Sequence, residues 1–426
     1  MTLHSRSRSI PDYVDTLDGF RAIAAFLVLM FHYWQQSWVS MVIRIGPLTV
    51  DFTNVISIGG LGVELLFVLS GFCLYYPLAM HPERRLHVGS YIFKRIVRIL
   101  PTYVLCVVIC SAYQIGRLDG TVLRAQFLGN LTLTQMSTAS LAYNRINPVL
   151  WSIAIEAQFY VVFPLLLPLF RKKPYWVMLG AFAVGETWRW YLRDVDYSRI
   201  GWLMNQLPGM IDAFVGGMLA AHITAQLKHS LTKKQQRALQ PAFTLAAVLF
   251  VLLYFLVTMY IGALRYRDLP ENLSRLQMHT RKFVIAAFAG AIACSTMSLP
   301  WMHRLLGNPV TRFASTISYQ IYMWHAWIAL RLKEWHIPGY ATERPMDDPA
   351  WRFPYLMLCI ALSLIAAIFM TYCVERPISR FLLNHAPRWA RPKPTEVPQN
   401  DQQTPAAPCT AALVRRDDRA ADVDRH

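Results

Sequence analysis

The chain has 426 residues, of which 55% are hydrophobic and 16% are charged, and its mean hydropathy is +0.30. This composition excludes a disordered protein and argues against a soluble multidomain enzyme, because ordinary globular proteins carry about 25% charged residues. The net charge is +17, but the basic residues gather at the ends of apolar runs. We therefore attribute the charge to contact with a lipid bilayer and expect no nucleic-acid partner.

Apolar runs long enough to cross a bilayer recur along the chain. A spanning helix needs about 20 mostly apolar residues. Ten segments meet this requirement, so we predict an all-α polytopic membrane helix bundle. They are 17–39, 56–80, 99–117, 149–170, 174–193, 205–226, 241–263, 282–300, 312–332 and 353–374.

An even number of spans puts both termini on one side of the membrane, and the distribution of Lys and Arg favours the cytoplasmic side. We divide the chain into a cytoplasmic N-terminal segment (1–16), a membrane domain (17–385) and a cytoplasmic tail (386–426). The tail is rich in Pro, Ala, Gln, Asp and Arg, which predicts disorder. The more polar stretch 127–141 is interpreted as a loop helix or a re-entrant segment.

The cysteines do not indicate a metal site. There are seven, an odd number, and no two have CxxC spacing. This pattern supports neither a disulfide framework nor zinc binding, so we expect no metal.

Arg21 and His32 are ionisable residues inside the first apolar run, LDGFRAIAAFLVLMFHYW. Ionisable groups at membrane depth are costly and are functional candidates by default. Eleven residues make close to three turns, so both side chains share a helix face about 16 Å apart along the axis. A neutral imidazole can accept a proton from a hydroxyl. The alternative is an arginine that reaches the headgroups and a structural histidine.

Other polar residues fall at a depth similar to that of His32. Glu64, Glu156 and His325 each lie within a different span, which indicates a buried polar chamber suited to a reaction site or an ion path. Glu186 and Arg189 are three residues apart, which is more typical of a structural ion pair. The glycines of GGLG at 59–62 favour close helix packing over a nucleotide loop.

Arg95 and Arg98, in KRIVRILP, are three apart and therefore share a helix face. Two guanidiniums so placed can hold phosphates through paired hydrogen bonds. Without other context, the alternative of ordinary positive charge beside a cytoplasmic helix end is favoured.

Taken together and in order, these segments resemble the acyltransferase 3 family of integral membrane acyltransferases. The resemblance covers about residues 15–380. The segments that carry it are LDGFRAIAAFLVLMFHYW, GLGVELLFVLSGF, KRIVRILPTY, WSIAIEAQFYVVFP, SYQIYMWH and VERPI.

The resemblance implies an enzyme of the bacterial inner membrane. It would take an acyl group, usually acetyl, from cytoplasmic acyl-CoA and deliver it to a hydroxyl of a carbohydrate or another envelope or secreted acceptor. Arg21 and His32 match the family's essential pair, and Arg95 and Arg98 match residues expected to handle the coenzyme A phosphates. Glu156 and His325 fall in family motifs with less defined roles.

On this basis we expect His32 to deprotonate the acceptor hydroxyl, with a transient acyl-histidine as the alternative. Glu156 or Glu64 would orient the imidazole, and Arg21 would line the donor channel or stabilise negative charge. The short tail implies either that the chain completes the transfer itself or that it hands the group to another protein. A proton-coupled transporter or flippase is the main alternative function. The short loops argue against a receptor or scaffold, and another O-acyltransferase family fits the motifs less well.

Overall fold

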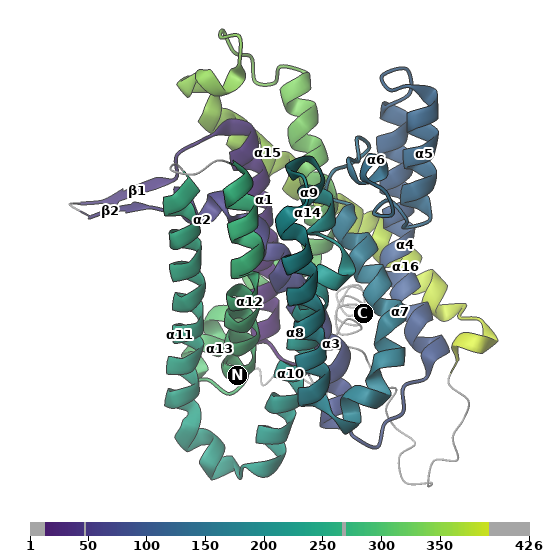
Figure 1. Ribbon diagram of the computed structural model, residues 1–426, viewed down its shortest axis with the longest axis vertical. Coiled ribbons are helices and arrows are strands. Elements are labelled where there is room, and N and C mark those ends of the chain that lie inside the picture. Colours follow the sequence, from purple (N-terminus) through teal and green to yellow (C-terminus); the bar gives the residue numbers. More distant parts are fainter. Residues whose placement is uncertain (1–12, 47, 266–269, 392–426) are drawn as a thin grey trace, which may run out of the picture.

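The computed structural model describes residues 13–46, 48–265 and 270–391. Within these ranges, ten helices have 18 or more residues, and each overlaps one predicted span. Most run side by side along the long axis of the molecule (Figure 1). The prediction of an all-α polytopic bundle is thus confirmed. The long helices are α1 Thr16–Ser37, α3 Gly62–Met80, α4 Val88–Tyr113, α7 Trp151–Lys172, α8 Pro174–Tyr191, α10 Leu207–Ser230, α11 Lys233–Arg265, α12 Pro270–Ser295, α14 Pro309–Glu334 and α15 Pro349–Phe369.

Not all ten helices are apolar enough to cross a membrane by composition alone. In the described residues seven meet that criterion, or eight if α12 and α13 (Pro300–Leu306), which are bent by 118°, form one broken span. The other two, α8 and α14, have the length but are more polar. On α14 this polarity is largely internal, because Ser315, Ser318, Gln320 and His325 are all buried.

Shorter elements connect the long helices. A two-stranded antiparallel hairpin, β1 Val42–Ile45 and β2 Leu48–Asp51, projects from the side of the bundle (Figure 1). Helices α5 (Gly120–Leu131) and α6 (Ala139–Ala142) lie in the connection between α4 and α7. The polar stretch 127–141 covers the end of α5, the turn that follows it and most of α6. The remaining short α-helices are α2 Thr53–Ser57, α9 Tyr197–Leu203 and α16 Arg376–Asn384. A short π-helix, Met370–Glu375, joins α15 to α16.

Glycines bring three helices into close contact. A Cβ at Gly71 would overlap the Phe214 carbonyl oxygen, and one at Gly217 would overlap the Val68 carbonyl oxygen, so α3 and α10 meet backbone to backbone. A Cβ at Gly62 would lie 2.8 Å from the carbonyl oxygen of Ala24 on α1. The GGLG segment therefore serves close helix packing, as predicted, and fixes α1 against α3.

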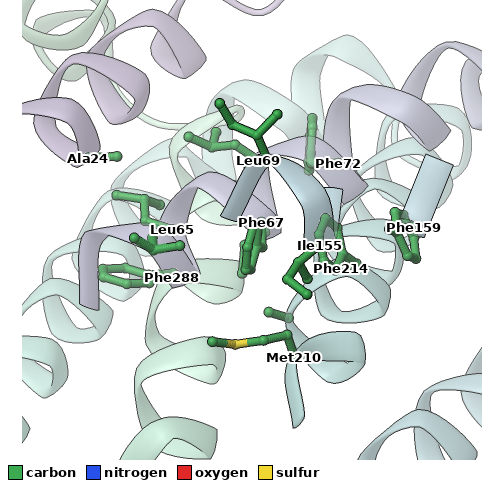
Figure 2. Close-up of a cluster of buried hydrophobic side chains, with 14 of the residues drawn as sticks. Ala24, Leu65, Phe67, Leu69, Phe72, Ile155, Phe159, Met210, Phe214 and Phe288 are labelled. Carbon is green, nitrogen blue, oxygen red and sulfur yellow. The ribbon is translucent and has the colours of Figure 1, made fainter. Parts of the chain in front are cut away.

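Stacked aromatic rings fill the core between α3, α7 and α10 (Figure 2). The Phe214 ring lies between those of Phe67 and Phe159, with centroids 4.5 Å and 4.1 Å away. Three large buried rings in contact pack α3, α7 and α10 together at the centre of the bundle.

Two boundaries differ from the sequence prediction. Helix α4 begins at Val88 rather than near 99, because the side chain of His87 accepts a hydrogen bond from the Ser90 amide and caps the helix. Arg95 and Arg98 therefore lie within α4. The start of the predicted disordered tail is ordered: Arg388–Ala390 form a 3-10 turn, and the Trp389 ring packs edge-on against Phe93 at 5.7 Å. Residues 392–426 and 1–12, which hold the rest of the two predicted terminal segments, lie outside the described residues.

Candidate active site

One face of α14 carries four polar side chains along most of its length. Ser315, Tyr319, Tyr322 and His325 are spaced by four, three and three residues, so they share a helix face. This face contacts α1, α4 and α7. Ser315 is within reach of Arg21, Tyr319 donates to the Ile99 carbonyl, and Tyr322 shares a hydrogen bond with the Ser152 hydroxyl. The face thus runs from Arg21 at one end to His325 at the other. We call these two ends the arginine end and the histidine end.

Two histidines meet at one end of this face. The ring centroids of His32 and His325 are 5.1 Å apart, although the residues are 293 positions apart in the sequence. The Nδ1–H of His325 donates to the carbonyls of Ile321 and Tyr322 at 3.0 Å and 2.8 Å. Its Nε2 atom is therefore the unprotonated one, and it is buried without a hydrogen-bond partner. A buried acceptor with no donor is costly in a folded protein and indicates a place for a hydroxyl or water.

His32 has the same tautomer, fixed by a different residue. Its Nδ1–H donates to the Gln35 Oε1 atom at 3.1 Å, so its Nε2 atom also carries a free lone pair. We expected Glu156 or Glu64 to orient this imidazole. In the structure Gln35, one helical turn along α1, has that position, and both carboxylates are bonded elsewhere. Spacing of three residues on α1 was the available signal for Gln35.

The arginine end is built from α1, α3 and α4. The guanidinium of Arg21 lies 3.5 Å from the Ser315 hydroxyl and 3.8 Å from the Cys73 sulfur. The Ser315 hydroxyl donates in turn to Asp18 at 2.8 Å. Arg98 lies close enough to Arg21 for the two positive charges to act on each other. The three arginines predicted from the sequence are thus brought to one region.

Arg95 is held by aromatic rings rather than by a carboxylate. Its guanidinium lies 5.2 Å from the Tyr160 ring and 5.8 Å from the Tyr91 ring, and its Nε atom is buried without a partner. In the part of the chain that the structure describes, none of Arg21, Arg95 and Arg98 forms an ion pair. Three guanidiniums in one region, none of them in a direct ion pair among the described residues, are suited to bind a multiply charged anion.

Glu156 lies beside the arginines. Its Oε1 atom accepts hydrogen bonds from the Ser70 hydroxyl at 2.6 Å and from the Tyr160 hydroxyl at 2.5 Å. Since the same Tyr160 ring supports Arg95, the carboxylate fixes the surface on which the guanidinium rests. Tyr160 follows Glu156 by one helical turn, which a sequence reader could have noticed, whereas nothing in the sequence indicates Ser70.

Glu375 is a further site residue that the sequence analysis did not select. Its carboxylate accepts a hydrogen bond from the amide of buried Gln320 at 2.7 Å and is near enough to Arg98 to act on its charge. The signal was available, because Glu375 belongs to the VERPI segment at the end of an apolar run.

Glu64 belongs to a different cluster. It forms an ion pair with Arg281 of α12 at 2.7 Å, and both side chains are only 3% exposed. Nearby, Arg189 bridges Asp212 and Glu186 at 2.6 Å and 2.7 Å. The predicted Glu186–Arg189 pair is therefore present, and these pairs join α3, α8, α10 and α12. Within the described ranges no three His, Cys, Asp or Glu side chains gather as a metal site would require.

Comparison with known proteins decides the family. A family model described as an acyltransferase domain, acyltransferase 3, matches residues 14–372. The chain belongs to the acyltransferase 3 family. The match includes the arginine end, both histidines and the whole polar face of α14, and ends just before Glu375. Together with the apolar helices, it identifies an integral membrane protein of an acyltransferase family.

Bacterial proteins with curated names are distant relatives of the chain. The peptidoglycan O-acetyltransferase OatA of Listeria monocytogenes is 24% identical over 74% of this chain and 49% of its own length. The O-acetyltransferase OatA of Staphylococcus aureus is 25% identical over 87% of this chain and 58% of its own length. The chain thus spans about half to three fifths of these relatives. No solved structure matches.

Proposed function

We propose that this protein is an acyl-CoA-dependent O-acetyltransferase that modifies a hydroxyl of a carbohydrate or another envelope or secreted acceptor. The observation that carries the proposal is the connection, by the polar face of α14, of two paired imidazoles to three arginines that form no direct ion pair among the described residues. The family and the O-acetyltransferase names of the relatives support the same chemistry.

The arginine end would hold the donor. The phosphates of coenzyme A are strongly anionic, and Arg95 and Arg98 offer planar donors that bind phosphate oxygens in pairs. The Nε–H of Arg95, which has no partner among the residues that the structure describes, is available for such a contact. Arg21 would line the path of the slim pantetheine arm from this end toward His32, about 16 Å further along α1.

The histidine end would carry the transfer. The Nε2 atom of His32 takes the proton of the acceptor hydroxyl while the hydroxyl oxygen attacks the thioester carbonyl carbon. The carbon–sulfur bond breaks, the acetyl group stays on the acceptor oxygen, and the thiolate leaves and takes up the proton. Gln35 holds the tautomer that this step needs. The free Nε2 atom of His325 would accept a hydrogen bond from the same hydroxyl or from its water and orient it.

Glu156 has a positioning role in this account. It fixes Tyr160, and Tyr160 fixes Arg95, so the carboxylate acts on donor binding. Glu64 supports the bundle through Arg281 rather than the reaction. We place the arginine end and both termini on the cytoplasmic side of a bacterial inner membrane, where acyl-CoA is found.

Donor binding by the arginines tests the proposal. Acetyl-CoA affinity and thioester turnover would be measured on purified protein for wild type and for the double variant Arg95→Ala/Arg98→Ala. The matched control is Lys94→Ala, an exposed cation on the same turn of α4. We expect the double variant to bind at least tenfold more weakly and the control to bind normally. Equal affinity of both variants, or no binding by folded wild type, would contradict the proposal and favour a transporter.

A further inference from the structure

Two adjoining hollows lie where α3, α7 and α10 end and α8 begins. Their volumes are about 990 Å³ and about 460 Å³, and they share Arg171, His222 and Gln226 as lining residues. Each is large enough for a polar headgroup of a small molecule. Neither the family match nor the proposed reaction assigns them a role.

The lining of both hollows is basic. Arg171, Lys172 and Lys173 line the smaller one, His222 and His229 line the larger one, and no carboxylate lines either. The Arg171 guanidinium is fixed by donating to the Arg84 carbonyl at 2.6 Å. The permanent charges are those of Arg171, Lys172 and Lys173, and such a concentration of cations favours an anion.

The neighbouring surface of α8 is suited to lipid. Tyr175 and Trp176 are 57% and 70% exposed at the start of α8, and such aromatic residues are enriched at the level of the headgroups. Leu179 and Phe182 continue the exposed face of Tyr175 at spacings of four and three residues. Tyr175, Leu179 and Phe182 thus form an exposed apolar stripe beside the hollows. A lipid whose anionic headgroup is bound in a hollow can place its acyl chains along this stripe.

The hollow is separate from the arginine end of the active site. Cys73 on α3 contacts Arg21, whereas Tyr75, two residues later, lines the larger hollow. Two residues correspond to about 200° around a helix, so the two regions lie on opposite faces of α3.

We propose that these hollows bind the phosphate headgroup of an anionic phospholipid. Basic pockets between helices at a membrane surface recognise such headgroups, and each Lys or Arg near the surface contributes roughly fivefold in affinity. The hollow, its basic lining and the adjoining apolar stripe together define the site. It does not depend on the proposed acetyl transfer.

The test measures binding of dioleoylphosphatidylglycerol and of dioleoylphosphatidylcholine to the purified full chain in detergent by native mass spectrometry. The variant is Lys172→Ala/Lys173→Ala. The matched control is Lys233→Ala/Lys234→Ala, two exposed lysines at the start of α11, which follows α10 after a two-residue turn. We expect wild type to prefer phosphatidylglycerol, the pocket variant to lose about twenty-five-fold in affinity, and the control to retain it. Size-exclusion profiles confirm folding.

A second measurement, of coenzyme A affinity, distinguishes a lipid headgroup from coenzyme A as the source of the bound phosphate. The inference requires coenzyme A affinity to be unchanged in Lys172→Ala/Lys173→Ala. It is overturned if this variant loses coenzyme A binding and keeps lipid binding, because the hollow would then belong to the donor. It is also overturned if wild type binds both lipids equally or if the pocket and control variants behave alike.

Discussion

The buried pair of Glu64 and Arg281 gives the sharpest prediction about stability. Replacing Arg281 with Met leaves a carboxylate that is 3% exposed without its partner at 2.7 Å. Breaking one side of a buried ion pair costs about 3–5 kcal/mol, and the lost hydrogen bond from Arg281 to the Met204 carbonyl adds about 1 kcal/mol. Arg281→Met should therefore lower the free energy of unfolding by about 4–6 kcal/mol.

A double-mutant cycle separates the pair from simple packing. Removing both charges in Glu64→Leu/Arg281→Met should cost less than Arg281→Met alone, because no uncompensated charge remains. The matched control is Lys282→Met at the next position, whose partner Glu186 lies 2.8 Å away with both side chains about one third exposed. Solvent screening limits that loss to about 1 kcal/mol.

The assay is equilibrium unfolding in mixed micelles of a mild detergent and dodecyl sulfate, followed by tryptophan fluorescence. The reasoning is refuted if Arg281→Met is no less stable than Lys282→Met, or if the double variant is less stable than Arg281→Met. A well-folded double variant without turnover would contradict the purely structural role given to the Glu64–Arg281 pair.

Three further predictions follow from single contacts. Gly217→Ala forces a Cβ onto the Val68 carbonyl and should destabilise the protein by about 1–3 kcal/mol or more. Gly180→Ala adds a Cβ in open space and should be neutral or stabilising by up to about 1 kcal/mol. Thermal unfolding of the two variants tests this difference. Amides at the start of α5 hold the pKa of Asp119 below its ordinary value of 3.8, so its cap is fully present above that pH and is lost as the pH falls through the lowered pKa. The protection of the α5 amides against hydrogen exchange, measured relative to their intrinsic rates, should therefore fall in acid for wild type but not for Asp119→Asn. Glu156→Gln should raise KM for acetyl-CoA more than it lowers kcat, because Glu156 positions the arginine surface; the opposite split would place the carboxylate at the reacting atoms.

The spanning helices could be predicted from the sequence because each needs only a local apolar run. Each of the ten predicted segments corresponds to one long helix. The start of α4 differs from the predicted boundary because it depends on a single capping contact. The two hairpin strands, Val42–Ile45 and Leu48–Asp51, were not predicted, because four-residue runs are too short for their alternation of apolar and polar residues to stand out beside the long apolar runs.

The partners of the site residues could not be predicted, because they come from distant parts of the chain. Glu64 and Arg281 are 217 residues apart, and each is equally compatible with many partners until the helices are packed. His32 and Arg21 could be selected, since one helix relates them. The contact of His32 with His325 depends on the packing of α1 against α14, which no local motif of either helix specifies.

The central claim is that the paired imidazoles perform the transfer and the arginines hold the donor. The most direct test compares acetyl-CoA affinity and thioester turnover of wild type, His32→Ala and His325→Ala. The account predicts unchanged affinity, a loss of turnover of about 10²–10⁴-fold for His32→Ala, and a smaller loss for His325→Ala. Full turnover by His32→Ala, or loss of donor binding with intact folding, would contradict the account.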